Sequence, residues 1–169
     1  MYPKFIQNKF IESLSKDAMS GKSPRLTDND WQIAFTRLRD TIITCPCGSE
    51  TFINVAGDAF CVNCGQKIPK PPVLNCHNHK YGLALFPGVN MYRCHIDKSS
   101  DDFTEVIGEV NRNPQNPAMW GLRNLSDIVW NVETQDGALK PIAKGQVAPI
   151  MAIKAIHFPN GMGIVEYSK

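Results

Sequence analysis

The chain has 169 residues, of which 43% are hydrophobic and 20% charged, with a formal net charge of +2. This length suits one ordinary domain or two small ones, and the small net charge without a long basic run indicates no nucleic-acid surface. No apolar run approaches the about 20 residues that a bilayer-spanning helix needs, and charges interrupt residues 1–14. We therefore expect a cytoplasmic protein with reduced cysteines, no signal peptide and no membrane partner.

Residues 2–44 are expected to be helical. The apolar residues of the first part have a mixed helical periodicity, which fades at residues 20–24. A second helix should begin after Thr27, an N-cap residue with Asp30 at the third helical position, as in a capping box. The apolar stripe of this helix consists of Trp31, Ala34, Phe35, Leu38 and Ile42.

Two close cysteine pairs follow, Cys45 with Cys47 and Cys61 with Cys64. This is the spacing of a zinc ribbon, in which each pair supplies two thiolates from one tight turn to a tetrahedral Zn²⁺, although the first pair is one residue shorter than the usual C-x-x-C. We expect two short strands, 51–55 and 59–60, in a hairpin between the pairs. The alternative is a pair of disulfides or four buried thiols.

The remainder of the chain is predicted to consist of strands and turns after a stiff proline-rich linker at residues 67–72. Hairpin turns are expected at Asp136-Gly137 and Lys144-Gly145, and short strands at this spacing favour a sandwich or a barrel. The expected strands lie at residues 83–85, 89–92, 103–110, 119–125, 129–133, 153–158 and 164–167.

Residues 24–31, Pro-Arg-Leu-Thr-Asp-Asn-Asp-Trp, resemble the end of a protein kinase C-lobe, where an Arg-Pro-Ser/Thr-x-x-Glu-Trp run opens the last helix. Arg25 would be the arginine of that motif, with Leu26 in the place of the usual proline. The order of helical segment, cysteine ribbon and β-rich region is similar to bacterial Ser/Thr kinases that accompany phosphatase and von Willebrand-type proteins in tellurite-resistance-like systems. The resemblance implies the C-terminal part of such a kinase.

This part of a kinase would have no catalytic activity of its own. The sequence contains no Gly-rich phosphate loop, no His-Arg-Asp loop and no Asp-Phe-Gly. Because positioning residues and Mg²⁺ ligands do nearly all of phosphoryl transfer, we expect that the chain is not an enzyme.

The β-rich region has two further motifs. Met91-Tyr92-Arg93 lies where forkhead-associated domains have Ile-Gly-Arg, and Asn124-Leu125-Ser126 lies near the later Ser/Asn loop of that family. The region thus resembles a forkhead-associated sandwich, a fold that binds phosphothreonine through its loops. The sequence departs from the forkhead-associated motif in two places: it has no Gly before Arg93 and no Ser-x-x-His after it. We expect partner contacts from Arg93, Arg123, Asn124 and Ser126, and phosphate-independent docking is the favoured alternative.

A second metal site is a further possibility, and its candidate ligands are Cys76, His77, His79, Cys94 and His95. In a strand, adjacent residues face opposite sides, so only some of these side chains can converge. Packed cysteines and exposed histidines are the favoured interpretation.

The sequence therefore predicts an α+β, mostly β chain in three parts: a helical segment (1–44), a four-cysteine zinc ribbon (45–68) and a forkhead-associated-like β-sandwich (69–169). The expected function is that of a non-catalytic, zinc-stabilised regulatory module that binds a protein, phosphorylated or not, such as the phosphatase or the von Willebrand-type protein of the same system. A nucleic-acid-binding zinc ribbon is the alternative. A metal-dependent enzyme ranks third, because four thiolates leave no open coordination position.

Overall fold

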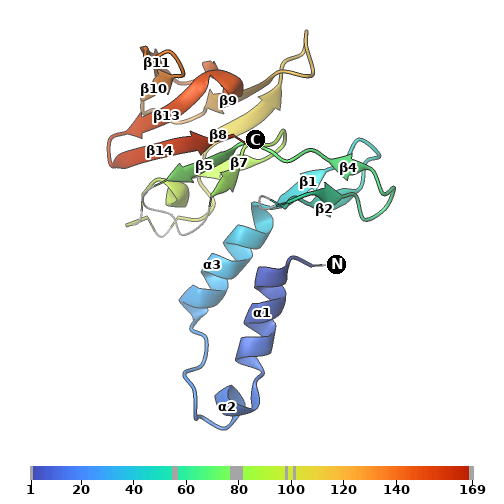
Figure 1. The fold of residues 1–169 in the computed structure, drawn as a ribbon. Helices are drawn as coiled ribbons and strands as arrows, with labels where there is room; N and C mark the ends of the chain where they lie inside the picture. Colours follow the sequence, from blue (N-terminus) through green and yellow to red (C-terminus); the bar gives the residue numbers. More distant parts are fainter. Residues whose placement is uncertain (1, 55–56, 77–81, 98, 101, 168–169) are drawn as a thin grey trace.

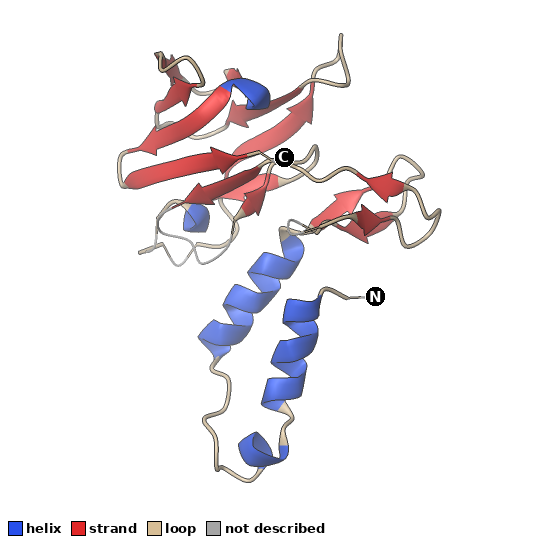
Figure 2. Ribbon diagram, viewed as in Figure 1, coloured by secondary structure: helices blue, strands red, loops and turns tan. Residues whose placement is uncertain are grey.

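The computed structural model describes residues 2–54, 57–76, 82–97, 99–100 and 102–167. The chain folds into an N-terminal helical hairpin, two small β-hairpins and a larger β-sandwich (Figure 1). Strands make up more of the described chain than helices do (Figure 2), so the expected α+β, mostly β class is confirmed.

The helical hairpin consists of α1 (Lys4–Ser13), the single turn α2 (Lys16–Met19) and α3 (Asp28–Arg39), with α1 and α3 side by side (Figure 1). Helix α3 begins with the predicted capping box: Thr27 Oγ1 accepts a hydrogen bond from the backbone N–H of Asp30, and Asp30 Oδ2 accepts one from that of Thr27. The rings of Phe10 and Trp31 pack between the helices at a centroid distance of 4.9 Å.

The helical prediction is wrong for residues 42–44, which form strand β1 (Ile42–Thr44). This strand pairs with β2 (Glu50–Phe52), and Ile43 is buried opposite Thr51. Ile42 continues the apolar stripe of α3 in the sequence, but pairing with β2 decides its conformation, since a β-branched residue is well suited to a strand.

The expected hairpin between residues 51–55 and 59–60 is also wrong. Strand β2 pairs with β1, whereas β3 (Ala59–Phe60) pairs with β4 (Lys67–Ile68). Each cysteine pair therefore lies inside its own hairpin, in the connection between its two strands, and not at the ends of a shared one.

Two antiparallel sheets form the sandwich. The six-stranded sheet has the order β11-β10-β13-β14-β5-β6, and the four-stranded sheet has the order β12-β9-β8-β7. The strands of the first sheet are β5 (Val73–Cys76), β6 (Leu83–Ala84), β10 (Trp130–Thr134), β11 (Leu139–Ile142), β13 (Ile153–Phe158) and β14 (Gly161–Glu166). Those of the second are β7 (Asn90–Tyr92), β8 (Val106–Arg112), β9 (Trp120–Asn124) and β12 (Val147–Pro149), and two short 3₁₀ helices are η1 (Arg93–His95) and η2 (Ile150–Ala152).

The core lies between these sheets. Trp130 of β10 is fully buried, and its ring meets Phe158 edge-on at a centroid distance of 5.8 Å. Opposite it, β8 has Gly108, where a Cβ atom would lie 2.7 Å from Trp130 Cη2, so only glycine leaves room for the indole. The predicted hairpin turn at Asp136-Gly137 is confirmed, since β10 pairs with β11 across it and Gly137 has a positive φ of 84°. Lys144-Gly145 is also a turn, with a φ of 83° at Gly145, but the hairpin expected there is wrong, because β11 and β12 belong to different sheets.

A polar seam joins the end of α3 to the sandwich. Asp40 accepts a hydrogen bond from His95 Nε2 at 2.7 Å, and both side chains are buried. Arg39 lies over the ring of Tyr92, 3.4 Å from its centroid, and donates to the backbone oxygen of Phe103. The seam therefore binds the helical hairpin to η1 and to the loop before β8.

Candidate metal centre

Four cysteine side chains meet between the two small hairpins. Cys45 and Cys47 come from the connection between β1 and β2, and Cys61 and Cys64 come from the connection between β3 and β4. All four Sγ atoms lie within 4.8 Å of one another. The Cys45–Cys64 and Cys47–Cys61 Sγ–Sγ distances are both 3.7 Å, well beyond the about 2.05 Å of a disulfide bond. The cluster therefore consists of free thiols that could hold a metal ion.

The two connections have the same local geometry. In the first, the N–H of Gly48 donates to the oxygen of Cys45, and in the second the N–H of Gly65 donates to that of Cys61. Both glycines have positive φ angles, 85° and 71°, which L-residues rarely adopt. The glycine after each cysteine pair thus lets the chain turn back while both thiols point to the same side.

Backbone amides and burial set the charge of the thiols. The N–H of Ser49 is the main cause that lowers the pKa of Cys47 to about 6. The N–H groups of Cys64 and Asn63 likewise lower the pKa of Cys61. For Cys45, the N–H of Cys47 favours the thiolate, but burial and the neighbouring thiols outweigh it and raise the pKa to about 12. Cys47 and Cys61 thus ionise readily, and the positive charge of a bound cation would stabilise the thiolates of the other two cysteines.

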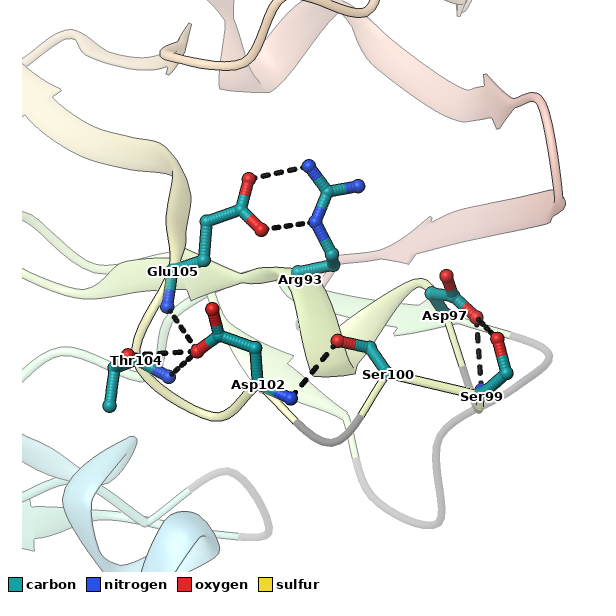
Figure 3. Close-up of polar contacts among 7 residues, drawn as sticks. All are labelled: Arg93, Asp97, Ser99, Ser100, Asp102, Thr104 and Glu105. Carbon is teal, nitrogen blue, oxygen red and sulfur yellow. Dashed lines mark hydrogen bonds and ion pairs between the residues drawn. The ribbon is translucent and has the colours of Figure 1, made fainter.

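The predicted partner-binding residue Arg93 lies at the start of η1, directly after strand β7. Figure 3 shows its Nε and Nη2 facing the two carboxylate oxygens of Glu105, with which they form a bidentate ion pair. This pair raises the pKa of Arg93 and lowers that of Glu105. The loop before β8 is held by Asp102, whose Oδ1 accepts from Thr104 and from the N–H of Glu105 (Figure 3).

Asn124 and Ser126 are buried, with 0% and 6% exposure. The Asn124 side-chain amide donates to the backbone oxygens of Ile128 and Ile142, and its oxygen accepts from the N–H and the hydroxyl of Ser126. These contacts use all the hydrogen bonds that the amide nitrogen can donate. We therefore assign both residues to the support of this loop, in place of the expected partner contact.

Arg123 is the most accessible of the four predicted partner-binding residues. Its side chain is 45% exposed, and its Nη1 contacts Glu109 Oε1 at 3.3 Å. A salt bridge this exposed contributes little and exchanges readily, so Arg123 can still contact a partner.

The second candidate metal site is not assembled by the residues described. His95 Nδ1 accepts a hydrogen bond from the N–H of Tyr92, so Nε2 carries the proton that is donated to Asp40. Both ring nitrogens are thus used, and His95 is buried, contrary to the expected exposure. Cys76 and Cys94 are buried thiols whose pKa values are raised by desolvation. His77 and His79 lie outside the described residues. Within the described chain, the four-cysteine cluster is the group that could hold a metal.

Sequence reasoning missed the seam residues Arg39 and Asp40. Their partners are more than fifty positions away in the chain, and no local pattern marks them.

Comparison of the chain with protein-family models, with curated proteins and with solved structures gave no match. The kinase-tail and forkhead-associated resemblances therefore stay predictions. No helix among the described residues has the length and apolar character needed to cross a bilayer.

Proposed function

We propose that the chain is a non-catalytic protein-interaction module that a zinc ion stabilises. The observation that carries the metal part is the spacing of the thiols. Zn–S bonds of about 2.3 Å in a tetrahedron separate the sulfur atoms by about 3.8 Å. The two Sγ–Sγ distances across the cluster are 3.7 Å. Cys45, Cys47, Cys61 and Cys64 would hold the ion, and a site with four thiolates serves folding because it has no open position for a substrate.

The interaction part is supported by the absence of kinase motifs from the sequence and by the sandwich that follows the ribbon. Two antiparallel sheets with exposed loops are compatible with a forkhead-associated-like fold. The resemblance to the C-terminal region of a bacterial Ser/Thr kinase favours a regulatory protein partner, with the phosphatase and the von Willebrand-type protein of such systems as candidates. A nucleic-acid-binding ribbon is less favoured, since Lys67 is the single basic residue in the sequence of the ribbon, 45–68.

Docking without phosphate is the form of the proposal that the geometry favours. A phosphothreonine would have to displace Glu105 from Arg93, and this bidentate pair is already well matched. If phosphate were the ligand, Arg93→Ala would abolish the preference for a phosphothreonine peptide over its unmodified form. We expect no such preference in the wild-type chain.

Three measurements test the proposal. Elemental analysis should find about one Zn²⁺ per chain, which Cys61→Ser loses. ATP with Mg²⁺ would raise the thermal midpoint if it bound the native state. We expect no binding and therefore an unchanged midpoint. Single-stranded and duplex DNA should bind weakly, if at all, at physiological salt. A chain without metal, a nucleotide-dependent stabilisation, or tight and strongly salt-dependent DNA binding would each contradict the proposal.

A further inference from the structure

A hollow of about 450 Å³ lies on the outer face of the four-stranded sheet, beside the polar loop 113–119. Strands β8, β9 and β12 form its floor, where Asn111, Gly121 and Pro149 stand in one row across the three strands. Leu122 next to Gly121 is fully buried, so the alternation of the strand places Gly121 on the outer face. A glycine in the middle of the row leaves the floor without a side chain. A Cβ atom there would lie 2.3 Å from Val147 Cγ1, so any larger residue would fill the hollow or displace Val147.

Two arginines and several apolar side chains line this hollow. Arg112 and Arg123 are both exposed, and no carboxylate is among the described lining residues. The nearest acid is Glu109, which accepts from Arg123 and from the side-chain amide of Asn111. The hollow therefore keeps a positive charge.

The apolar part of the lining is unusually open. Met119 is 48% exposed and Val147 is 44% exposed. Trp120 closes the end of the hollow, and the alternation that buries Leu122 places its ring on the core side, against Phe86. The guanidinium carbon of Arg112 lies 5.9 Å from the centroid of this ring. Arg, Trp and Met are residue types that are enriched in protein interfaces and depleted from ordinary surface.

The loop beside the hollow is held in place before any partner binds. The N–H of Asn113 donates to the oxygen of Met119, and Asn113 Oδ1 accepts from the N–H groups of Gln115 and Asn116. Arg112 Nη1 donates to the oxygen of Pro117 at 3.2 Å. Because these bonds already order the loop, binding would cost little conformational entropy.

We propose that this hollow binds an acidic peptide segment of a protein partner. Acidic side chains of the peptide meet the guanidinium groups of Arg112 and Arg123, one at each, because the strand alternation places these two arginines on opposite sides at the end of the sheet. Their planar forks match carboxylate geometry. A large apolar side chain of the peptide packs against the exposed Met119 and Val147. The site deepens the proposed interaction function and rests on it. It also places the contact on the outer face of the sheet, away from Arg93, which Glu105 already holds.

The test uses the full, zinc-loaded chain and a library of random peptides displayed on phage. Peptides selected by the wild-type chain are synthesised and their dissociation constants measured by fluorescence anisotropy. We expect selected sequences with Asp or Glu beside Leu, Phe or Trp. Arg123→Gln and Arg112→Gln should each weaken their binding about tenfold. Arg25→Gln, an exposed arginine of the helical segment, is the matched control and should leave the affinity unchanged. Met119→Ser tests the apolar half without a change of charge and should also weaken binding.

Five results would overturn the site. Selected peptides without acidic residues, affinity that is unchanged in both arginine variants, and the absence of any selected peptide each do so. Displacement of the peptides by a single-stranded oligonucleotide, with a steep salt dependence, would point to nucleic acid instead. Peptides whose binding depends on Arg93 in place of Arg123 would overturn this site and leave the interaction function standing. A thermal midpoint equal to that of the wild type verifies that each variant is folded.

Discussion

The cysteine ribbon and the β-sandwich obtain a buried interior in different ways. Of the residues that the two small hairpins (42–68) bury in the apolar core, two of six are cysteines of the metal cluster. These six are Ile43, Cys45, Ile53, Ala59, Cys61 and Ile68. The sandwich instead buries whole rows of aliphatic side chains around Trp130, and ten strands contribute to its two sheets.

This difference shows where a metal is needed. Strands of two or three residues cannot bury enough apolar surface to offset the entropy of ordering them. Zinc bound to four thiolates supplies the stabilisation that a larger apolar core would otherwise give. Its apparent binding free energy is about 10–16 kcal/mol in zinc-finger peptides. The sandwich should be stable without it. The predictions below test this contrast between the two regions.

The largest effect is expected from loss of the metal. Cys61→Ser, or treatment with a strong chelator, should unfold the ribbon, since its fold depends on four thiolates held together. The sandwich should stay folded, because its core does not require the cluster. Methyl NMR signals of Ile43 and Ile68 should collapse, while those of Leu122 and Ile156 persist.

Cys94→Ala is the matched control, because this buried cysteine lies outside the cluster. It should leave the zinc content at one ion per chain. Loss of the sandwich signals together with those of the ribbon would show that the two regions fold as one unit, against the contrast drawn here.

The next largest effect concerns the sandwich. Trp130→Ala should lower the free energy of unfolding by about 3–5 kcal/mol, because it leaves a cavity opposite Gly108. Urea titration, followed by circular dichroism, gives this value. The zinc content should not change. Trp130→Phe should cost less than half as much, since the indole N–H has no hydrogen-bond partner among the described residues. Equal losses in the two variants would argue against a packing role.

A smaller loss is expected at the seam between α3 and the sandwich. His95→Phe keeps the ring volume but removes the donor to Asp40, which should cost about 1.5–3 kcal/mol. In this variant the helical hairpin should unfold at a lower urea concentration than the sandwich. His157→Phe is the control, because this histidine is 42% exposed. A change above about 0.5 kcal/mol there would contradict the assignment.

The smallest effect concerns acid and the loop before β8. The backbone N–H of Thr104 is the main cause that lowers the pKa of Asp102. Because the pKa is lower in the folded state than in the unfolded state, the contribution of Asp102 is present above about pH 4 and is lost as the pH falls through the folded value. Asp102→Asn should therefore flatten the decline in the urea midpoint between neutral and acidic pH. An unchanged slope would show that Asp102 does not contribute.

Local patterns predicted the elements whose cause is local. The capping box of α3, the hairpin turn at Gly137 and strand 153–158 follow from neighbouring residues, and the structure has them as expected. The convergence of the four cysteines was also predictable, because their spacing fits two tight turns.

What the sequence could not reveal depends on distant residues. Ile42 belongs to an apolar helical stripe, yet β2 pairs with it and makes it a strand. Arg93 has the residue type of a phosphate ligand, but Glu105, twelve positions later, occupies two of its nitrogens. Asn124 ends strand β9 next to a polar turn, whereas its buried amide donates to the carbonyl of Ile128 and to that of the distant Ile142. Each partner is fixed by tertiary structure.

The seam at Asp40 also has a mechanical consequence. Helix α3 has twelve residues and is therefore about 18 Å long. Asp40 attaches its C-terminal end to the sandwich, and its other end points away from the sandwich (Figure 1). A rigid-body motion of the helix would therefore be a rotation about the buried His95–Asp40 contact. A rotation of about 10° at that pivot would displace the far end of the helix by about 3 Å. A protein bound at the tip of the helical hairpin could thus apply torque to η1, and strain in the sandwich would be transmitted outward as motion of the tip.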